Sequence, residues 1–391
     1  MRVPRVGDPL RVLEVVPYYE PAWAFGGPPK VMTEEARELT RRGHQVTVFT
    51  TDALDAEHRA RPSGHSVLDG VDVHRFRNIS NAAAFHRYRF QPRGMRRALA
   101  AVSADVVHLS ELRHELAILT WQAARKRDIP LVISAHGTLP RRDGWTGRIR
   151  GLYDRAFVNP MLEHGAGFVA QTDHEVAQYV EQGAPADRVH LVPLGIDSPP
   201  APTAEGSPDL GVPDGARVVM FLGRIHPLKG VERLIRGFAE IASAHEDTWL
   251  VIAGRDDGGL EPARALAAQL GIAGRVTFPG AIYGERRFDA YRQADIFAIT
   301  PIHFEETSLA SLEAASVGTP LLVSDQAEVP HLEACGAGTC IGAHESPGPA
   351  LGAMLDQYLA PAGAAAARMI DDHHVWPKVG ERIEQVFRSV S

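Results

Sequence analysis

Short apolar runs alternate with amphipathic segments along most of the chain. An apolar run bounded by turn residues predicts a strand buried on both faces, and strands that alternate with helices are typical of parallel α/β sheets. In the first half, the predicted strands are Arg11–Pro17, Gln45–Thr51, Val71–Phe76, Val106–Leu109, Leu131–Ala135, Gly167–Gln171 and Val189–Val192. In the second half, they are Arg217–Leu222, Thr248–Ala253, Arg275–Phe278, Asp295–Thr300 and Pro320–Val323.

The amphipathic segments predict the helices. They lie at Pro28–Arg42, Gly230–His245, Glu261–Leu270, Glu285–Gln293, Ser308–Val317 and His373–Ser391, with an irregular or helical connector at Ala360–Ala367. Proline suits the first turn of a helix, because the N–H that it lacks would have no partner there. The first helix therefore begins at Pro28.

A stretch rich in proline and small polar residues, Gly195–Gly215, predicts a linker between two halves. Each half has the alternation of a doubly wound domain, in which ligands bind at the carboxyl ends of the strands. We therefore expect an N-terminal Rossmann-like domain over residues 1–200, a second one over 201–372, and a C-terminal helix over 373–391.

Composition narrows the functional class. The chain has 391 residues, of which 45% are hydrophobic and 23% charged, with a net charge of −7. These values are ordinary for a globular protein and argue against a nucleic-acid partner. Cys335 and Cys340 have no His or Cys cluster around them, so neither a disulfide framework nor a zinc site is expected. The first ten residues lack an apolar signal core and no run is long enough for a membrane span, so we expect a cytoplasmic protein.

Two carboxylates, Glu305 and Glu313, are separated by seven residues in H-F-E-E-T-S-L-A-S-L-E-A-A-S-V-G-T-P. Thr307 and Ser308 provide capping hydroxyls for the helix that follows, and Gly318 ends it. Glu313 is the only charge inside this apolar helix, and a buried carboxylate needs a partner. We expect it to reach back toward the helix N-terminus, beside a bound phosphate.

A second block, F-L-G-R-I-H-P-L-K-G, lies between a strand and a helix. Gly223 permits close approach of a ligand to the backbone. Arg224 and Lys229 provide a planar fork and a point charge, both suited to phosphate oxygens. A departing nucleoside diphosphate gains negative charge, which two cations held there would stabilise.

Both blocks resemble those of the retaining nucleotide-sugar glycosyltransferases of family 4, which have E-G-F-G-L-x-x-L-E-A-M-A-x-G-x-P and G-R-x-x-x-x-K-G. Thr307-Ser308 replaces the family's Phe-Gly. The resemblance implies a GT-B fold, in which two doubly wound Rossmann-like domains face each other across a cleft. In this fold the C-terminal helix crosses back to the first domain, and Trp376 would anchor it there. It also implies transfer of a sugar from a nucleotide-diphosphate donor to an acceptor hydroxyl, with retention, in polysaccharide, glycolipid or natural-product biosynthesis.

The resemblance also implies roles for individual residues. Arg224 and Lys229 would hold the diphosphate, Glu313 the ribose, and Glu305 the transferred sugar. The remaining donor contacts would come from Gly254, Ile282 near the base, and Thr307, Ser308 and Leu309 at the helix start. The first domain would contribute His136 and the loop of Gly26 and Gly27. The basic pair replaces the metal of other transferases, so no metal or other cofactor is expected, and Asp256-Asp257 is interpreted as loop capping.

Other functions remain open at this stage. A sugar-nucleotide-binding subunit without transferase activity, an epimerase, or a relative that uses a non-hydroxyl acceptor fits the same blocks. A dinucleotide oxidoreductase is disfavoured, because no G-x-G-x-x-G follows the first strand. Two arginine-rich stretches are either solvated helix faces or sites for an anionic acceptor or a membrane surface. They contain Arg87, Arg89, Arg93, Arg96 and Arg97 in His86–Arg97, and Arg148, Arg150 and Arg155 in Arg141–Arg155.

Overall fold

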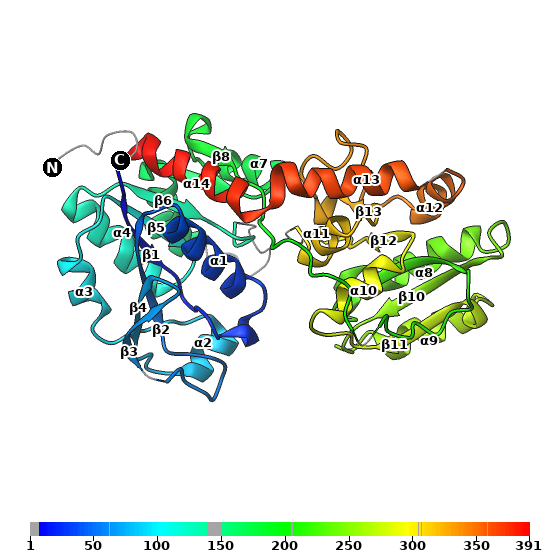
Figure 1. Cartoon of the computed structure of the whole chain (residues 1–391). Helices are drawn as coiled ribbons and strands as arrows, with labels where there is room; N and C mark the ends of the chain where they lie inside the picture. The colour runs from blue at the N-terminus through cyan, green and yellow to red at the C-terminus, as the bar shows by residue number, and fades with distance from the viewer. Residues whose placement is uncertain are drawn as a thin grey trace. The chain divides into compact units, whose positions relative to one another are not determined.

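The computed structural model describes residues 8–61, 63–139, 151–204, 206–303, 305, 307–357 and 359–391. The chain divides into two compact units (Figure 1). Unit 1 comprises Met1–Gly195 and Trp376–Ser391, and unit 2 comprises Ile196–Val375. The sequence prediction had placed these divisions at 200/201 and 372/373.

Unit 1 is built on a sheet with the order β3-β4-β2-β1-β5-β6-β7-β8. All its neighbouring strands are parallel except β3, which runs antiparallel to β4. Its strands are β1 (Arg11–Val15), β2 (Gln45–Thr51), β3 (Gly64–Leu68), β4 (Val71–Phe76), β5 (Val106–Ser110), β6 (Leu131–Ser134), β7 (Gly167–Ala170) and β8 (Val189–Leu191). Leu13 lies opposite Thr47 on one side and Val107 on the other, so β1 is the central strand at which the chain changes direction across the sheet.

The helices of unit 1 bury the apolar faces of this sheet. They are α1 (Pro28–Arg41), α2 (Asn81–Arg87), α3 (Met95–Ala101), α4 (Glu115–Arg127), α6 (Asn159–His164), α7 (Asp173–Glu181) and α14 (Trp376–Val390). The C-terminal helix α14 packs against α1 and β7, which confirms that it returns to the first domain. Trp376 is buried against Gly195, where a side chain would clash with the indole ring. The Trp376 side chain therefore anchors the start of α14, as expected.

Unit 2 is built on a parallel sheet with the order β11-β10-β9-β12-β13-β14. Its strands are β9 (Arg217–Leu222), β10 (Thr248–Ala253), β11 (Val276–Gly280), β12 (Ile296–Ile299), β13 (Leu321–Ser324) and β14 (Gly338–Ile341). Its helices are α8 (Val231–Ile241), α9 (Leu260–Gln269), α10 (Arg286–Arg292), α11 (Leu309–Ser316), α12 (Pro347–Leu355) and α13 (Ala360–Met369).

The predicted α/β class with two doubly wound sheets is confirmed, although the strands β3 and β14 were not predicted. β3 is mostly exposed and β14 half-buried, so neither has the continuous apolar run of a strand covered on both faces. The alanine-rich connector is helical, in α13. Among the described residues, no helix is both long and apolar enough to span a bilayer.

Candidate functional site

The carboxyl ends of β9 and β12 form the topological switch point of unit 2. β9 pairs with β10 on one side and with β12 on the other, so the loops that follow β9 and β12 leave in opposite directions. Open α/β sheets bind ligands at this point. The first loop carries Arg224 and Lys229, and the second carries Glu305.

The guanidinium of Arg224 lies on the loop after β9 and is half-exposed. Its Nη1 donates to Oδ2 of Asp257 at 2.6 Å, and this hydrogen bond lowers the pKa of the Asp257 carboxyl. The neighbouring Asp256 accepts hydrogen bonds from the backbone N–H groups of Gly258, Gly259 and Leu260. Asp256 therefore caps the loop, as predicted. Asp257 does not cap it with its side chain but forms an ion pair with Arg224, the arginine expected to bind phosphate.

Lys229 and Glu305, two predicted site residues, contact each other directly. Lys229 ends a short 3-10 turn, Pro227–Lys229, and its Nζ donates to Oε1 of Glu305. The side chains are 21% and 22% exposed, so solvent or a ligand reaches both. Unit 2 thus brings together residues that are 76 positions apart in the sequence.

Glu313 is buried on α11 and has a partner that the sequence analysis missed. Arg287 on α10 donates to both of its carboxylate oxygens, from Nε at 2.8 Å and from Nη2 at 2.7 Å. The hydroxyl of Tyr291 is a third donor, at 3.3 Å. The expectation that Glu313 reaches back to the N-terminus of its own helix is wrong, because α10 packs beside α11 and presents a cation there. The hydrogen bonds to Glu313 raise the pKa of Arg287.

The start of α11 also differs from expectation. Ser308 is the residue that precedes the helix, but its hydroxyl makes no capping hydrogen bond. The hydroxyl of Thr307 donates instead to the backbone carbonyl of Glu328, at 2.6 Å. Neither hydroxyl therefore caps the helix, and Leu309 is its first residue. Thr307 ties the helix start to the segment that follows β13.

Gly254 and Ile282 follow β10 and β11. Gly254 has a φ of +145°, and a Cβ atom there would lie 1.6 Å from the carbonyl oxygen of Gly223. Only glycine fits so close an approach between the ends of β9 and β10. Ile282 is half-buried in the loop after β11.

In unit 1, His136 follows β6 in a left-handed conformation, with a φ of +47°. Its Nδ1 lies 3.2 Å from the side-chain amide nitrogen of Gln171, so Nδ1 accepts and the ring carries its proton on Nε2. Burial lowers the pKa of His136 to about 4, and the imidazole is neutral near pH 7. The buried Glu175 accepts hydrogen bonds from the backbone N–H groups of Gly137 and Gln171 and so shapes this loop.

The loop between β1 and α1 contains the predicted glycines. Gly26 has a φ of +99°, and Gly27 is the residue before α1. Phe25 stacks on Tyr18 with ring centroids 4.6 Å apart. The hydroxyl of Tyr18 donates to Glu111, which follows β5 with a φ of +65°. Burial raises the pKa of Glu111 to about 7.

No sequence motif had singled out Glu111, Glu175 or Gln171. The available signal was the position of Glu111 directly after a strand, the same position that distinguished His136. Both are non-glycine residues with positive φ at the ends of neighbouring strands, where strain often accompanies function.

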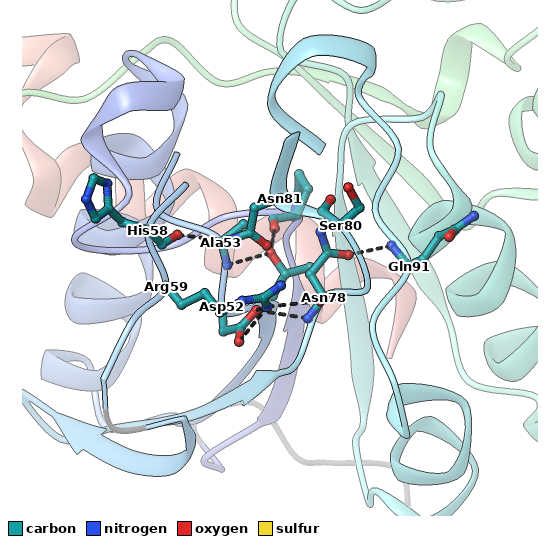
Figure 2. A network of polar contacts seen from close by, with 10 residues as sticks. Asp52, Ala53, His58, Arg59, Asn78, Ser80, Asn81 and Gln91 are labelled. Atoms are coloured by element: carbon teal, nitrogen blue, oxygen red, sulfur yellow. Dashed lines mark hydrogen bonds and ion pairs between the residues drawn. The ribbon is translucent and has the colours of Figure 1, made fainter. Parts of the chain in front are cut away.

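A polar network at the same edge joins the loops after β2 and β4 (Figure 2). Asp52 accepts from Nη1 of Arg59, at 2.7 Å and 3.0 Å, and from the backbone N–H of Asn78, at 2.9 Å. The side chain of Asn78 then accepts from the backbone N–H of Gln91 at 2.7 Å. The network therefore holds Asn78 against Gln91, which lies within the first arginine-rich stretch, His86–Arg97.

That stretch is not one helix. α2 ends at Arg87, a loop follows, and α3 begins at Met95. The arginines of the stretch are exposed, and Arg89 donates to Glu115 at 3.0 Å. In the second stretch Arg155 is exposed, whereas Arg148 and Arg150 lie outside the described residues.

Comparison with known proteins identifies relatives of both halves. The family described as "Glycosyl transferase 4-like domain" matches residues 26–195, and "Glycosyl transferases group 1" matches residues 203–350. The D-inositol 3-phosphate glycosyltransferase of Mycolicibacterium gilvum is 30% identical over 349 residues, which covers 82% of this chain and 74% of that enzyme. The enzyme of the same name from Nocardia farcinica is 37% identical over 200 residues, which covers 48% of this chain and only 44% of that enzyme.

Solved structures share the fold. The Anabaena protein HepE, in complex with UDP-glucose, superposes with a TM-score of 0.66 and 16% identity over 97% of this chain and 100% of that one. At this level of identity the likeness concerns the architecture of the chain.

Proposed function

Because the chain belongs to family 4 of the retaining glycosyltransferases, which have the GT-B fold and use nucleotide-sugar donors, we propose that unit 2 binds a uridine diphosphate sugar and unit 1 the acceptor. The complex of HepE with UDP-glucose supports the choice of uracil. The relatives named as D-inositol 3-phosphate glycosyltransferases support a polyol acceptor.

One observation carries the assignment of the donor site. The loops after β9, β10 and β12 and the helices α10 and α11 hold three pairs of opposite charge: Arg224 with Asp257, Lys229 with Glu305, and Arg287 with Glu313. A diphosphate would replace Asp257 on Arg224 and Glu305 on Lys229, since a dianion attracts both cations more strongly than a single carboxylate does. The two acids would then be released toward polar groups of the donor.

These residues then have distinct roles. Arg224 and Lys229 bind the diphosphate and stabilise the charge that develops on it as the sugar departs. Glu305, released from Lys229, accepts hydrogen bonds from hydroxyls of the transferred sugar. Glu313 accepts a ribose hydroxyl at Oε1, which has a second lone pair beyond the one that Arg287 uses, whereas Oε2 already accepts from Arg287 and Tyr291.

The rest of the donor site comes from the loops after β10 and β11 and from the start of α11. Gly254 lets the backbone approach the nucleotide, Ile282 lies beside the base, and Thr307, Ser308 and Leu309 present the helix start to phosphate. With the leaving group neutralised by side chains, we assign no metal to the transfer. In keeping with retention, the departing phosphate takes the proton of the acceptor hydroxyl on the same face of the sugar.

In unit 1, we assign His136 and the loop of Gly26 and Gly27 to the acceptor. A neutral imidazole that carries its proton on Nε2 is a hydrogen-bond donor to a hydroxyl or phosphate oxygen. The exposed arginines Arg87 and Arg93 suit an anionic acceptor, such as a phosphorylated polyol, or the anionic surface of a membrane, where the acceptor would be a lipid. Flotation with anionic vesicles at low salt distinguishes the soluble acceptor from the membrane surface, because only binding to the membrane predicts that the protein floats with the vesicles.

The donor assignment is tested by calorimetric titration of the wild-type protein with UDP, GDP, ADP and TDP. We expect UDP to bind tightest. Binding that is lost in Lys229→Ala but kept in Arg255→Ala, an exposed arginine on a neighbouring loop, would support the site. Equal affinity of Lys229→Ala and wild type for UDP would contradict it.

A further inference from the structure

Three buried side chains of unit 1 converge below its carboxyl edge. Glu14 comes from β1, Glu35 from α1 and His108 from β5, and none of the three is more than 4% exposed. One ligand atom from each lies within 4.8 Å of the other two. Two carboxylates in a dry interior repel each other and lose their hydration, so such a cluster requires a compensating charge.

Four polar atoms of this cluster have no hydrogen-bond partner among the residues that the structure describes. They are both carboxylate oxygens of Glu14, Oε1 of Glu35 and Nδ1 of His108. Nδ1 of His108 and Oε1 of Glu35 are 2.8 Å apart, yet they are not aligned for a hydrogen bond. Four donor atoms for a cation, or for protons, are therefore left available in one place.

The other nitrogen of His108 is already engaged. Its Nε2 lies 2.7 Å from the hydroxyl of Ser134 on β6. If Nε2 donates its proton to Ser134, Nδ1 presents a lone pair to the two carboxylates. Histidine ligands of metals are commonly oriented in this way, by a hydrogen bond from the nitrogen that does not bind the metal.

We propose that Glu14, Glu35 and His108 bind one divalent transition-metal ion, with zinc as the best match. One imidazole and two carboxylates are ligands that zinc accepts, and their two negative charges balance the charge of the ion. A cavity of about 10 Å³, lined by Glu35, Ser134 and His136, has room for one water beside Glu35.

The ion has a structural role in unit 1. It ties the central strands β1 and β5 to α1, whose first residue follows the loop of Gly26 and Gly27. Ser134, the partner of His108, is two residues before His136. The ion therefore anchors the loop of Gly26 and Gly27 through β1 and α1, and it is linked to the loop of His136 through the hydrogen bond between His108 and Ser134 on β6. The donor residues lie on unit 2.

The first experiment measures metal in untagged wild-type protein by mass spectrometry, after gel filtration in chelator-treated buffer. We expect about one zinc per chain, since buried structural zinc is held tightly. Glu14→Gln and His108→Gln should lose at least nine-tenths of it. Glu38→Gln is the matched control. Glu38 is buried on α1, as Glu35 is, but it pairs with Arg41 and Arg42. Zinc retained in Glu14→Gln and His108→Gln would overturn the site.

A second experiment does not depend on variants that might misfold. Wild-type protein is unfolded in urea with EDTA and refolded with or without zinc or cobalt. We expect a higher urea midpoint with metal and, with cobalt, a visible absorption band of a protein-bound ion. The proposal would be overturned if zinc, cobalt and manganese all leave the urea midpoint of the metal-free wild-type protein unchanged.

Discussion

Arg287 and Glu313 form a two-pronged ion pair between α10 and α11, with nitrogen–oxygen distances of 2.8 Å and 2.7 Å. The pair is mostly buried, since the two side chains are 25% and 10% exposed. Together with the hydroxyl of Tyr291, the pair orients the Glu313 carboxylate. In the function proposed above, this carboxylate would accept a ribose hydroxyl of the donor.

Removing Arg287 should cost stability. Arg287→Ala leaves the buried carboxylate of Glu313 with Tyr291 alone, and we expect a loss of about 1–3 kcal/mol in the free energy of unfolding. The double variant Arg287→Ala/Glu313→Gln should lose less than the sum of the single changes, because the uncompensated charge is gone. Urea unfolding of the four proteins measures this coupling, and strictly additive losses would show that the pair is not energetically linked.

Substitutions of Glu305 and Glu313 should affect different steps, one nucleotide binding and the other turnover. Glu313→Gln weakens hydrogen bonds to the ribose, and we expect UDP affinity to fall by roughly tenfold, which corresponds to about 1.4 kcal/mol. Glu305→Gln removes the carboxylate that competes for Lys229, so UDP affinity should stay or rise while kcat falls. Titration with UDP and steady-state kinetics measure both, and weaker UDP binding in Glu305→Gln alone would reverse the two assignments.

Charge at the leaving group is tested by Arg224→Ala and Lys229→Ala. Each should lower kcat by ~10²–10³, the scale for removing one donor that stabilises charge in the transition state. For Arg224→Ala the melting temperature should change little, because Arg224 is 56% exposed and its pair with Asp257 contributes little. Arg255→Ala serves as the control and should keep wild-type activity. Wild-type kcat in either site variant would remove that residue from the diphosphate site.

Transfer should not depend on a metal at the donor. The native enzyme, treated briefly with EDTA, should keep its activity within a few-fold, because Arg224 and Lys229 supply the charge that a metal would otherwise provide. The proposed ion of unit 1 is buried among Glu14, Glu35 and His108 and supplies no charge to the diphosphate in this scheme. Activity that EDTA abolishes at once and that magnesium or manganese restores would contradict the prediction.

Glu111 should make stability depend on pH. Burial raises its pKa in the folded protein to about 7, above the ordinary value of 4.5, so the folded state binds the proton more tightly than the unfolded state does. Its contribution is therefore complete below pH 4.5 and is lost as the pH rises through about 7. Glu111→Gln should flatten the pH profile of stability between these values. The same profile measured for Glu57→Gln, an exposed residue, should match wild type, and an unchanged slope in Glu111→Gln would refute the assignment.

The sequence alone was sufficient for the features that depend on neighbouring residues. The apolar runs predicted most strands, because burial on both faces of a parallel sheet requires such runs. Gly223, Arg224 and Lys229 follow one strand, so their common loop could be predicted from spacing. Loop capping by Asp256 is local in the same sense, since it bonds residues two to four positions further on.

Only the tertiary structure decided which distant side chains meet. Glu313 lies 26 residues from Arg287. His108 meets Glu14 because β5 pairs with β1, and it meets Glu35 because that side chain extends from α1 to His108. Glu175 reaches the N–H of Gly137 from a helix 38 residues further along the chain. No local pattern encodes such partners, since they depend on strand order and helix packing. The sequence showed that Glu313 needs a partner, and the packing of α10 against α11 supplied Arg287.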